Sequence, residues 1–384
     1  MAAVVAELIE NPAASTGGYI GRIPVRNLWL LMLYASELFR ARGAAMIGLE
    51  DTPDELPDLV AKILADAVEA RQHRQLSSGY RSRNAILNRV RGRIDVLTTD
   101  RHQLLARGRV ACRFDELTID TPRNRFVRAA LETISKLVRH RDVAHRCRVL
   151  ANGMKALGVT GNAPTRAEMS ADRFGRHDAD DRLMVAAAKL AFDLALPTEE
   201  AGAHWLPLPE REVTWVRHLF EKAVGGFYDA VLSQTEWQVR CGGWLEWQIE
   251  PEKKTSGIDN ILPKMKTDVV LDHLPSKTRI VIDTKFTSII TGGWYREETL
   301  RSGYLYQIYA YLHSQVGRND LFADHASGML LHPSVGETVD ETVDIQGHCI
   351  RFANLDLAAS PREIRSQLLR FCLPTFRENL FNSV

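Results

Sequence analysis

The sequence predicts a mixed α+β protein built from two domains. Its 384 residues are too many for one ordinary hydrophobic core, because single cores stop growing at roughly 250 to 300 residues. The composition, 45% hydrophobic and 25% charged with a net charge of +1, is typical of a soluble globular protein. Helix-like segments alternate with short β-like runs along the chain, and this alternation favours sheets packed against helices.

The predicted domain boundary lies between residues 150 and 180, where the sequence is rich in small and polar residues and shows no clear periodicity. We therefore place an N-terminal α/β domain at residues 20–160 and a second mixed α/β domain at residues 165–384.

Two helices are expected at the start of the N-terminal domain. The stretch "IPVRNLWLLMLYASELFRARG" is apolar on most sides and ends in a basic, glycine-containing segment, which suits a buried helix and its C-terminus. The stretch "DELPDLVAKILADAVEARQHRQL" predicts an amphipathic helix, because its apolar residues recur at helical spacing. They are Leu56, Leu59, Val60, Ile63, Leu64, Ala67 and Val68.

Arginine is dense in the rest of this domain, where short β-like runs and basic loops precede an amphipathic helix from about Asn124 to Arg139. The arginines are Arg81, Arg83, Arg89, Arg91, Arg93, Arg107, Arg109, Arg113, Arg123, Arg125 and Arg128. Such a surface suits phosphates or an acidic partner, but a solvated face with local ion pairs gives the same pattern. Arg91, Arg93, Arg123 and Arg125 are the residues that we expect to contact a partner or DNA.

The C-terminal domain is expected to follow the order helix, strands, helix, strand, helix. Its helices are predicted at "DRLMVAAAKLAFDLAL", "VRHLFEKAVGGFYDAVLSQ", "RSGYLYQIYAYLHSQ" and "PREIRSQLLRFCL". Its strands are predicted at "WQVRCGGWLEWQIE", "MKTDVVLDHLPSKTRIVIDTKF", "SGMLLHP" and "HCIRFANLDL".

Composition also excludes several classes of protein. The five cysteines are scattered and never form a C-x-x-C pair, which argues for reduced thiols in a cytoplasmic protein and against a zinc site. No run of about 18 apolar residues predicts a membrane span. The net charge of +1 does not exclude nucleic acid, because a local basic patch can attract phosphates.

Charged residues interrupt the predicted hairpin of the C-terminal domain. Asp283 and Lys285 are two residues apart in "IVIDTKF", so their side chains point to the same side of the strand. Asp268 begins the preceding strand, and the short turn "PSKT" can bring it close to Asp283. Such a cluster is costly in a dry interior unless a cation neutralises it. Carboxylate oxygens suit Mg²⁺, with Mn²⁺ as an alternative.

Three further residues agree with a metal-assisted hydrolytic site. Glu221, in the upstream helix, supplies a third carboxylate for the metal beside Asp268 and Asp283. Gln307 and Tyr311 are four residues apart and share one helix face, where they would support the site or touch the DNA backbone. The metal would activate a water against a phosphodiester, and Lys285 would orient that water and screen negative charge. A D-x-K triplet alone is more often a surface ion pair.

Taken together, Glu221, "KTD" with Asp268, "DTK" with Asp283 and Lys285, and "QIYAY" with Gln307 and Tyr311 resemble the PD-(D/E)xK nuclease superfamily in its RecB-like form. The resemblance implies a restriction-endonuclease-like domain with a central mixed sheet flanked by helices. Thr267 replaces the usual proline before the first aspartate, a position that shapes the strand entry and carries no chemistry.

The segments "IPVRNLWLLMLYA", "RGRIDV", "FDELTIDTPRNRFVRAAL" and "LFEKAVGGFY" are similar to the McrC family of the McrBC modification-dependent restriction system. The resemblance implies that the N-terminal domain docks on an McrB-like AAA+ GTPase ring and stimulates its GTP hydrolysis. It also implies that the C-terminal domain is an endonuclease that cuts double-stranded, methylated DNA in defence against foreign DNA. The chain has no G-x-x-x-x-G-K-[ST] phosphate loop, so the GTPase is expected to be another chain.

Two other readings remain open. The chain could be a stand-alone nuclease of the same fold, although such an enzyme has no evident need of the N-terminal segments. It could instead be a non-catalytic adaptor that activates the GTPase, although an adaptor has no need of Asp268, Asp283 and Lys285. His273 and His332 lie near the site in sequence and receive no role.

Overall fold

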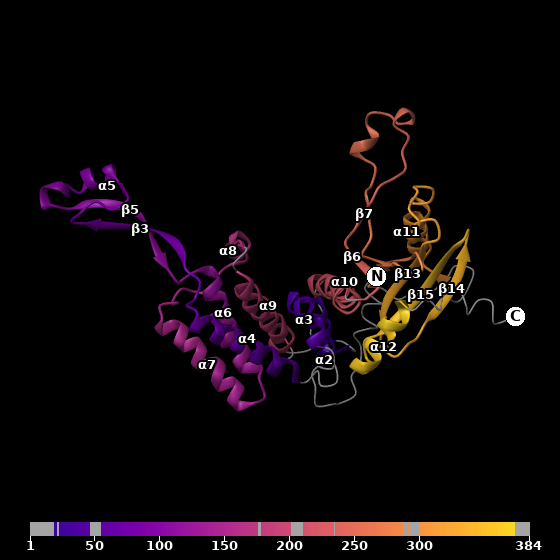
Figure 1. Cartoon of the computed structure of the whole chain (residues 1–384), viewed down its shortest axis with the longest axis horizontal. Coiled ribbons are helices and arrows are strands. Elements are labelled where there is room, and N and C mark those ends of the chain that lie inside the picture. Colours follow the sequence, from indigo (N-terminus) through magenta and orange to yellow (C-terminus); the bar gives the residue numbers. More distant parts are fainter. Residues whose placement is uncertain are drawn as a thin grey trace. The chain divides into compact units, whose positions relative to one another are not determined.

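The computed structural model describes residues 19–20, 23–46, 55–175, 178–200, 210–233, 235–286, 290–291 and 299–372, and Figure 1 shows the chain. The chain forms two compact units. Unit 1 combines Met1–Leu56 with Leu196–Val384, and unit 2 is Pro57–Ala195. Unit 2 is therefore inserted between two segments of unit 1.

This division differs from the boundary predicted near residue 160. The N-terminal helices α2 (Val25–Ala35) and α3 (Glu37–Met46) pack against α10 (Glu210–Leu232) of unit 1. Asn27 reinforces the packing, because its Nδ2 donates to the carbonyls of Leu357 at 2.7 Å and Ala359 at 3.0 Å. Periodicity shows that a helix has an apolar face but does not show which distant element covers that face.

The sequence predicted a single helix in this N-terminal segment, but the structure has two, α2 and α3. Ser36 ends α2 and begins α3: its Oγ donates to the carbonyl of Leu33 at 2.6 Å and accepts from the backbone N–H of Phe39 at 3.1 Å. A serine that bonds to neighbouring backbone competes with helix continuation and favours a cap.

Unit 2 is a group of helices that carries a small sheet. Its helices are α4 (Leu56–His73), α6 (Pro122–Leu137), α7 (Arg141–Ala156), α8 (Arg166–Ala171) and α9 (Ala179–Glu200). Thr121 caps α6 by accepting from the backbone N–H of Asn124 at 3.2 Å, and Pro122 occupies its first turn. These residues follow the preference for Thr before a helix and Pro at its start.

The small sheet has the strand order β3-β5-β4, with β3 (Gly79–Leu87), β4 (Arg93–Ile94) and β5 (Val110–Thr118). Strands β3 and β5 pair antiparallel over their whole length, from Gly79 opposite Thr118 to Leu87 opposite Val110. A short helix, α5 (Val96–Arg101), and a 3₁₀ turn, η3 (Leu105–Arg107), lie between β4 and β5. We call residues 79–118 the ribbon, which extends away from the helices of unit 2 in Figure 1.

Unit 1 is built on a six-stranded mixed sheet with the order β14-β15-β13-β10-β9-β6. The strands are β6 (Trp237–Cys241), β9 (Val269–His273), β10 (Thr278–Thr284), β13 (Ser327–Ser334), β14 (Asp340–Ile345) and β15 (His348–Asp356). The pairs β10–β13 and β13–β15 are parallel, and the other pairs are antiparallel. The prediction of a mixed α+β fold with a mixed sheet is confirmed.

Two short strands, β7 (Trp244–Leu245) and β8 (Met265–Lys266), pair with each other and enclose the 3₁₀ turns η4 (Pro251–Lys253) and η5 (Ile258–Asn260). Two-stranded pairs are also formed by β1 (Tyr19–Ile20) with β2 (Ile23–Pro24), and by β11 (Ile290–Thr291) with β12 (Thr299–Leu300).

Helices lie on both faces of the large sheet. Helix α11 (Ser302–His313) packs Ile308, Tyr311 and Leu312 against Val270 and Val281 of the central strands. Helix α10 approaches β9 at Gly225, where an added Cβ would lie 3.5 Å from Val269. Helix α12 (Pro361–Cys372) is joined to α10 by the hydroxyl of Tyr228, which donates to the carbonyl of Leu368 at 2.8 Å. Among the described residues, no helix is both long enough and apolar enough for a membrane span.

Candidate functional site

The two aspartates of the predicted hairpin meet at the ends of β9 and β10. The antiparallel register places Val281 opposite Val270 and Ile282 opposite Val269, so the next residues in each direction are Asp283 and Asp268. Asp268 directly precedes β9, and its Oδ2 accepts from both the backbone N–H and the hydroxyl of Thr284 at 2.7 Å. The hairpin thus places Asp268 and Asp283 at neighbouring positions on paired strands.

Asp283 is buried, with 2% of its surface exposed. Burial raises the pKa of its carboxyl to about 6, and the charge of Asp268 adds to the rise, while Lys285 and Arg217 oppose it. The Lys285 Nζ lies 2.6 Å from the Asp283 Oδ2 and forms an ion pair with it. Among the described residues, this Oδ2 has no other close partner.

Lys285 is held in place by α11. Its Nζ donates to the Oε1 of Gln307 at 3.0 Å and lies 5.1 Å from the ring centre of Tyr304. The Nε2 of Gln307 in turn donates to the hydroxyl of Tyr311 at 2.5 Å. Burial raises the pKa of Tyr311, and the charges of Asp283 and Asp268 contribute to that rise. Gln307 and Tyr311, predicted as supporting residues, therefore lie in one polar chain with Lys285.

Glu221 is not brought into this cluster. It lies on α10, partly exposed, with its Oε2 3.8 Å from the Nδ1 of His218. Its neighbour Phe220 packs against Phe286, with ring centres 6.4 Å apart, so this part of α10 is near the end of β10. Across the described part of the chain, no group of three His, Cys, Asp or Glu side chains could hold a metal ion. The structure thus supplies two of the three predicted carboxylates.

Sequence reasoning gave no role to Thr284 and His332, which both lie beside the site. Thr284 fixes the orientation of Asp268. His332 is buried on β13, and its ring centre lies 6.0 Å from that of Tyr304. The parallel register pairs Thr284 with Leu331, which places His332 next along β13. The only sequence signal for His332 was a histidine at the end of the apolar run "SGMLLHP", and the position of β13 beside β10 was not predictable from it.

A family model described as a McrBC 5-methylcytosine restriction system component matches residues 9–323, which is most of the chain. The chain belongs to this family. No curated protein matches this McrBC-family chain. A structural comparison matches it with a chain of a solved half-complex from a tetradecameric assembly of Thermococcus gammatolerans McrB AAA+ hexamers with bound McrC. That match has 15% identity and a TM-score of 0.36, and covers 82% of this chain and 68% of the other.

In the McrBC-family chain, two of the four arginines expected to contact a partner or DNA are exposed on the ribbon. They are Arg91, whose guanidinium lies 4.2 Å from the ring centre of Phe114, and Arg93 in β4. Arg125 is mostly covered and lies 3.6 Å from Asp120.

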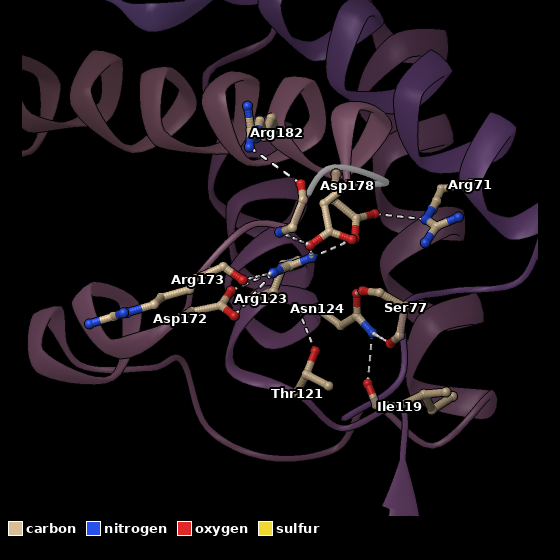
Figure 2. Close-up of polar contacts among 12 residues, drawn as sticks. Arg71, Ser77, Ile119, Thr121, Arg123, Asn124, Asp172, Arg173, Asp178 and Arg182 are labelled. Carbon is tan, nitrogen blue, oxygen red and sulfur yellow. Dashed lines mark hydrogen bonds and ion pairs between the residues drawn. The ribbon is translucent and has the colours of Figure 1, made fainter. Parts of the chain in front are cut away.

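The expectation for Arg123 needs correction, because this side chain is buried among carboxylates (Figure 2). Its guanidinium donates to Asp172 at 2.9 and 3.1 Å and to Asp181 at 2.6 Å, and lies 3.3 Å from Asp178. Buried carboxylates already pair this guanidinium, so its role is structural. It is not available to bind a phosphate of DNA or of a partner.

Proposed function

We propose that this chain is the Mg²⁺-dependent DNA endonuclease subunit of a modification-dependent restriction system and that it works with a separate AAA+ GTPase. Membership of a family of 5-methylcytosine restriction components supports the restriction role. The observation that carries the nuclease role is the meeting of Asp268 and Asp283 at the ends of two paired strands, with Lys285 2.6 Å from Asp283.

The donor set fits a hard divalent cation. Among the described residues, the buried Oδ2 of Asp283 has Lys285 as its one close partner, at 2.6 Å, and a carboxylate oxygen can accept more than one bond. Both hydrogen bonds from Thr284 go to the Oδ2 of Asp268. The Oδ1 of Asp268 would therefore be the oxygen that binds the metal ion. Mg²⁺ is commonly held by one or two carboxylates, with water and phosphate in its remaining positions, and Mn²⁺ takes the same ligands. Glu221 would be a third ligand only after a change in its side-chain position.

Each residue of the site would have a distinct role in phosphodiester hydrolysis. When bound, the ion supplies a Lewis acid that polarises the phosphodiester and lowers the pKa of a water. Asp268 and Asp283 would hold the cation, and Thr284 keeps the carboxylate of Asp268 in one orientation. Lys285, positioned by Gln307, donates hydrogen bonds to the attacking water and to oxygens on which negative charge develops. Preorganised donors of this kind need no rearrangement during the reaction.

The ribbon is the part of the chain that we assign to the GTPase partner. Its exposed apolar side chains include Tyr80, Leu97, Leu105 and Leu117, which are 61–84% exposed. Exposed apolar groups gathered on one element mark a protein interface, whereas surfaces that bind DNA are polar and positive. The basic residues Arg91 and Arg93 accompany them, and arginine is common in protein interfaces as well.

The proposal is tested by cleavage of methylated and unmethylated plasmids with the purified chain, with Mg²⁺, Mn²⁺ or EDTA, and with or without GTP and an McrB-like AAA+ GTPase from the same organism. We expect cleavage only with the metal, the partner and GTP. Cleavage by the chain alone would indicate a stand-alone nuclease. No cleavage, combined with stimulated GTP hydrolysis, would indicate the adaptor.

Variants separate the two activities. Lys285→Ala, Asp268→Ala and Asp283→Ala should each reduce cleavage by roughly 100-fold or more, because each removes a ligand or a donor to the developing charge. All three should stimulate GTP hydrolysis like the unmodified chain, because the ribbon belongs to unit 2. Lys277→Ala, which removes an exposed lysine from the turn of the same hairpin, is the matched control and should cleave normally. Glu221→Gln tests the third ligand.

A further inference from the structure

Asn124, a buried residue of α6, lies where the ribbon joins the helices of unit 2. The last pair of the ribbon is Gly79 opposite Thr118. Ser77 lies two residues before β3, and Ile119 directly follows β5. The Nδ2 of Asn124 donates to the carbonyl of Ser77 at 2.9 Å and to the carbonyl of Ile119 at 2.7 Å (Figure 2). One carboxamide therefore bridges both strands immediately beyond their last pair.

The neighbouring residue connects the same turn of α6 to the rest of unit 2. Arg123 binds Asp172 and Asp181, and Asp181 also accepts from the Nε of Arg71 on α4 at 2.7 Å. Asp181 has no exposed surface, and Figure 2 shows the carboxylates gathered around the guanidinium. Arg123 thus ties α6 to α4, to α9 and to the segment that precedes α9.

Two adjacent side chains of α6 thus connect the ribbon to the helices of unit 2. Asn124 binds the base of the ribbon, and Arg123 binds the carboxylates of Asp172 and Asp181. Both donor hydrogens of the carboxamide are used, and its Oδ1 lies 3.4 Å from the hydroxyl of Ser77. Aspartate has the same shape but no N–H to donate, and it would place a carboxylate against two carbonyl oxygens. Leucine or alanine would leave both carbonyls without this buried donor.

We infer that Asn124 is a positioning residue, which fixes the direction of the ribbon relative to the helices of unit 2 and so preorganises the ribbon for binding the AAA+ GTPase. The inference rests on the proposed function, in which the ribbon binds that partner. The contact residues of the ribbon stay intact when Asn124 is changed, so the expected loss is one of affinity. A ribbon free to swing must be ordered on binding, and that ordering opposes association.

The test compares Asn124→Asp and Asn124→Ala in the full-length chain with the matched changes Asn152→Asp and Asn152→Ala. Asn152 lies on α7 of the same unit and is exposed. Stimulated GTP hydrolysis is titrated with each variant to give the half-maximal concentration and the plateau. Hydrogen exchange is followed at residues 76–80 and 118–121, and thermal unfolding shows whether each variant is folded.

We expect faster exchange at the base of the ribbon and a half-maximal concentration raised about tenfold, with an unchanged plateau, for both Asn124 variants. The Asn152 variants should match the unmodified chain. If Asn124→Asp does not fold, the milder Asn124→Ala carries the test.

Two results would overturn the inference. One is faster exchange at the ribbon base with an unchanged half-maximal concentration, and the other is unchanged exchange in a folded variant. If DNA binding weakens while the half-maximal concentration is unchanged, the first of these results has occurred and the ribbon contacts DNA. If the unmodified chain fails to stimulate the GTPase, the proposed function itself fails, which is a distinguishable result.

Discussion

Individual buried charges in this protein differ in how completely they are paired. Arg123 has carboxylates on several sides, and each bond is short. Among the described residues, Asp283 has one ion-pair partner, Lys285, which lies at its Oδ2. A fully paired cluster in a protein interior serves structure, whereas incomplete pairing in a buried site is typical of a ligand site. By this criterion Arg123, which the sequence predicted to contact a partner or DNA, is structural. The hairpin with Asp268, Asp283 and Lys285 keeps its predicted role as a candidate ligand site.

Replacing Arg123 with methionine should lower the free energy of unfolding by about 3–5 kcal/mol, because Asp181 would keep a buried charge and lose its closest cation. Arg173→Met is the control, since only the backbone carbonyl of Arg173 takes part in the cluster and its side chain is exposed. Urea unfolding of both variants measures the difference. A loss below about 1 kcal/mol for Arg123→Met would contradict the structural role.

Asp178 gives the same cluster a dependence on pH. A hydrogen bond from the backbone N–H of Gly175 lowers the pKa of Asp178, and the charge of Arg123 lowers it further. A carboxyl with a lowered pKa stabilises the folded state above its ordinary pKa of about 4 and loses that effect as the pH falls through the folded value. Asp178→Asn should therefore be less stable than the unmodified chain at pH 7, and the difference should disappear in acid. Urea midpoints between pH 7 and pH 2.5 measure it, and a constant difference would contradict the assignment.

At the scale of single elements, α10 and α2 approach each other closely at Gly226. A Cβ at Gly226 would lie 2.0 Å from the carbonyl oxygen of Tyr34 and 3.1 Å from its carbonyl carbon. Backbone atoms cannot move aside as a flexible side chain can, so the two helices pack this closely only because residue 226 is glycine.

Gly226→Ala should therefore destabilise unit 1 by about 3 kcal/mol or more, because the helices must separate to admit one methyl group. Gly303→Ala is the matched control, because nothing lies within 4 Å of its added Cβ, and alanine should be tolerated there or slightly favoured in the helix. Chemical unfolding monitored by circular dichroism compares the two. Equal stabilities would show that the α2–α10 contact is looser than described.

Helices and strands with strong local sequence patterns could be predicted. The distant elements that pack against them in the fold could not. Period-two alternation and a short turn were enough to pair Asp268 with Asp283, because both residues belong to one hairpin. The α4 helix followed from the spacing of its apolar residues. His332 received no role because β13 joins β10 through a parallel pairing between distant segments. Arg123 was misread because its carboxylates lie some 50 residues away in sequence, where composition alone showed a polar loop.

At the scale of the whole molecule, unit 1 is made from two distant stretches of chain and unit 2 from one. The candidate site lies entirely in the second stretch, but the helix behind it, α10, is covered by α2 and α3 from the first. Leu28, Leu33 and Tyr34 of α2 have no exposed surface, so removal of these helices would expose the apolar face of α10.

A chain that begins at residue 165 should therefore fail to form a stable nuclease, although it retains Asp268, Asp283 and Lys285. Pro57–Ala195 expressed alone should fold cooperatively, because it is one compact unit with its own buried residues. Soluble yield, circular dichroism and binding of a hydrophobic dye measure both fragments. A well-folded 165–384 fragment would contradict the importance of α2 and α3 for unit 1.

Because unit 1 is formed from two separate stretches of chain, its folding during synthesis must wait for the second stretch. On the ribosome, α2 is complete at residue 35, and its partner α10 begins only at residue 210. At about 5–20 residues per second, the apolar surface of α2 waits roughly 9–35 s for its partner, while unit 2 can fold as soon as it emerges. Newly made chains should thus pass through a stage in which a finished unit 2 is tethered to an uncovered apolar helix. Chaperones that hold exposed apolar segments would bind the chain at that stage.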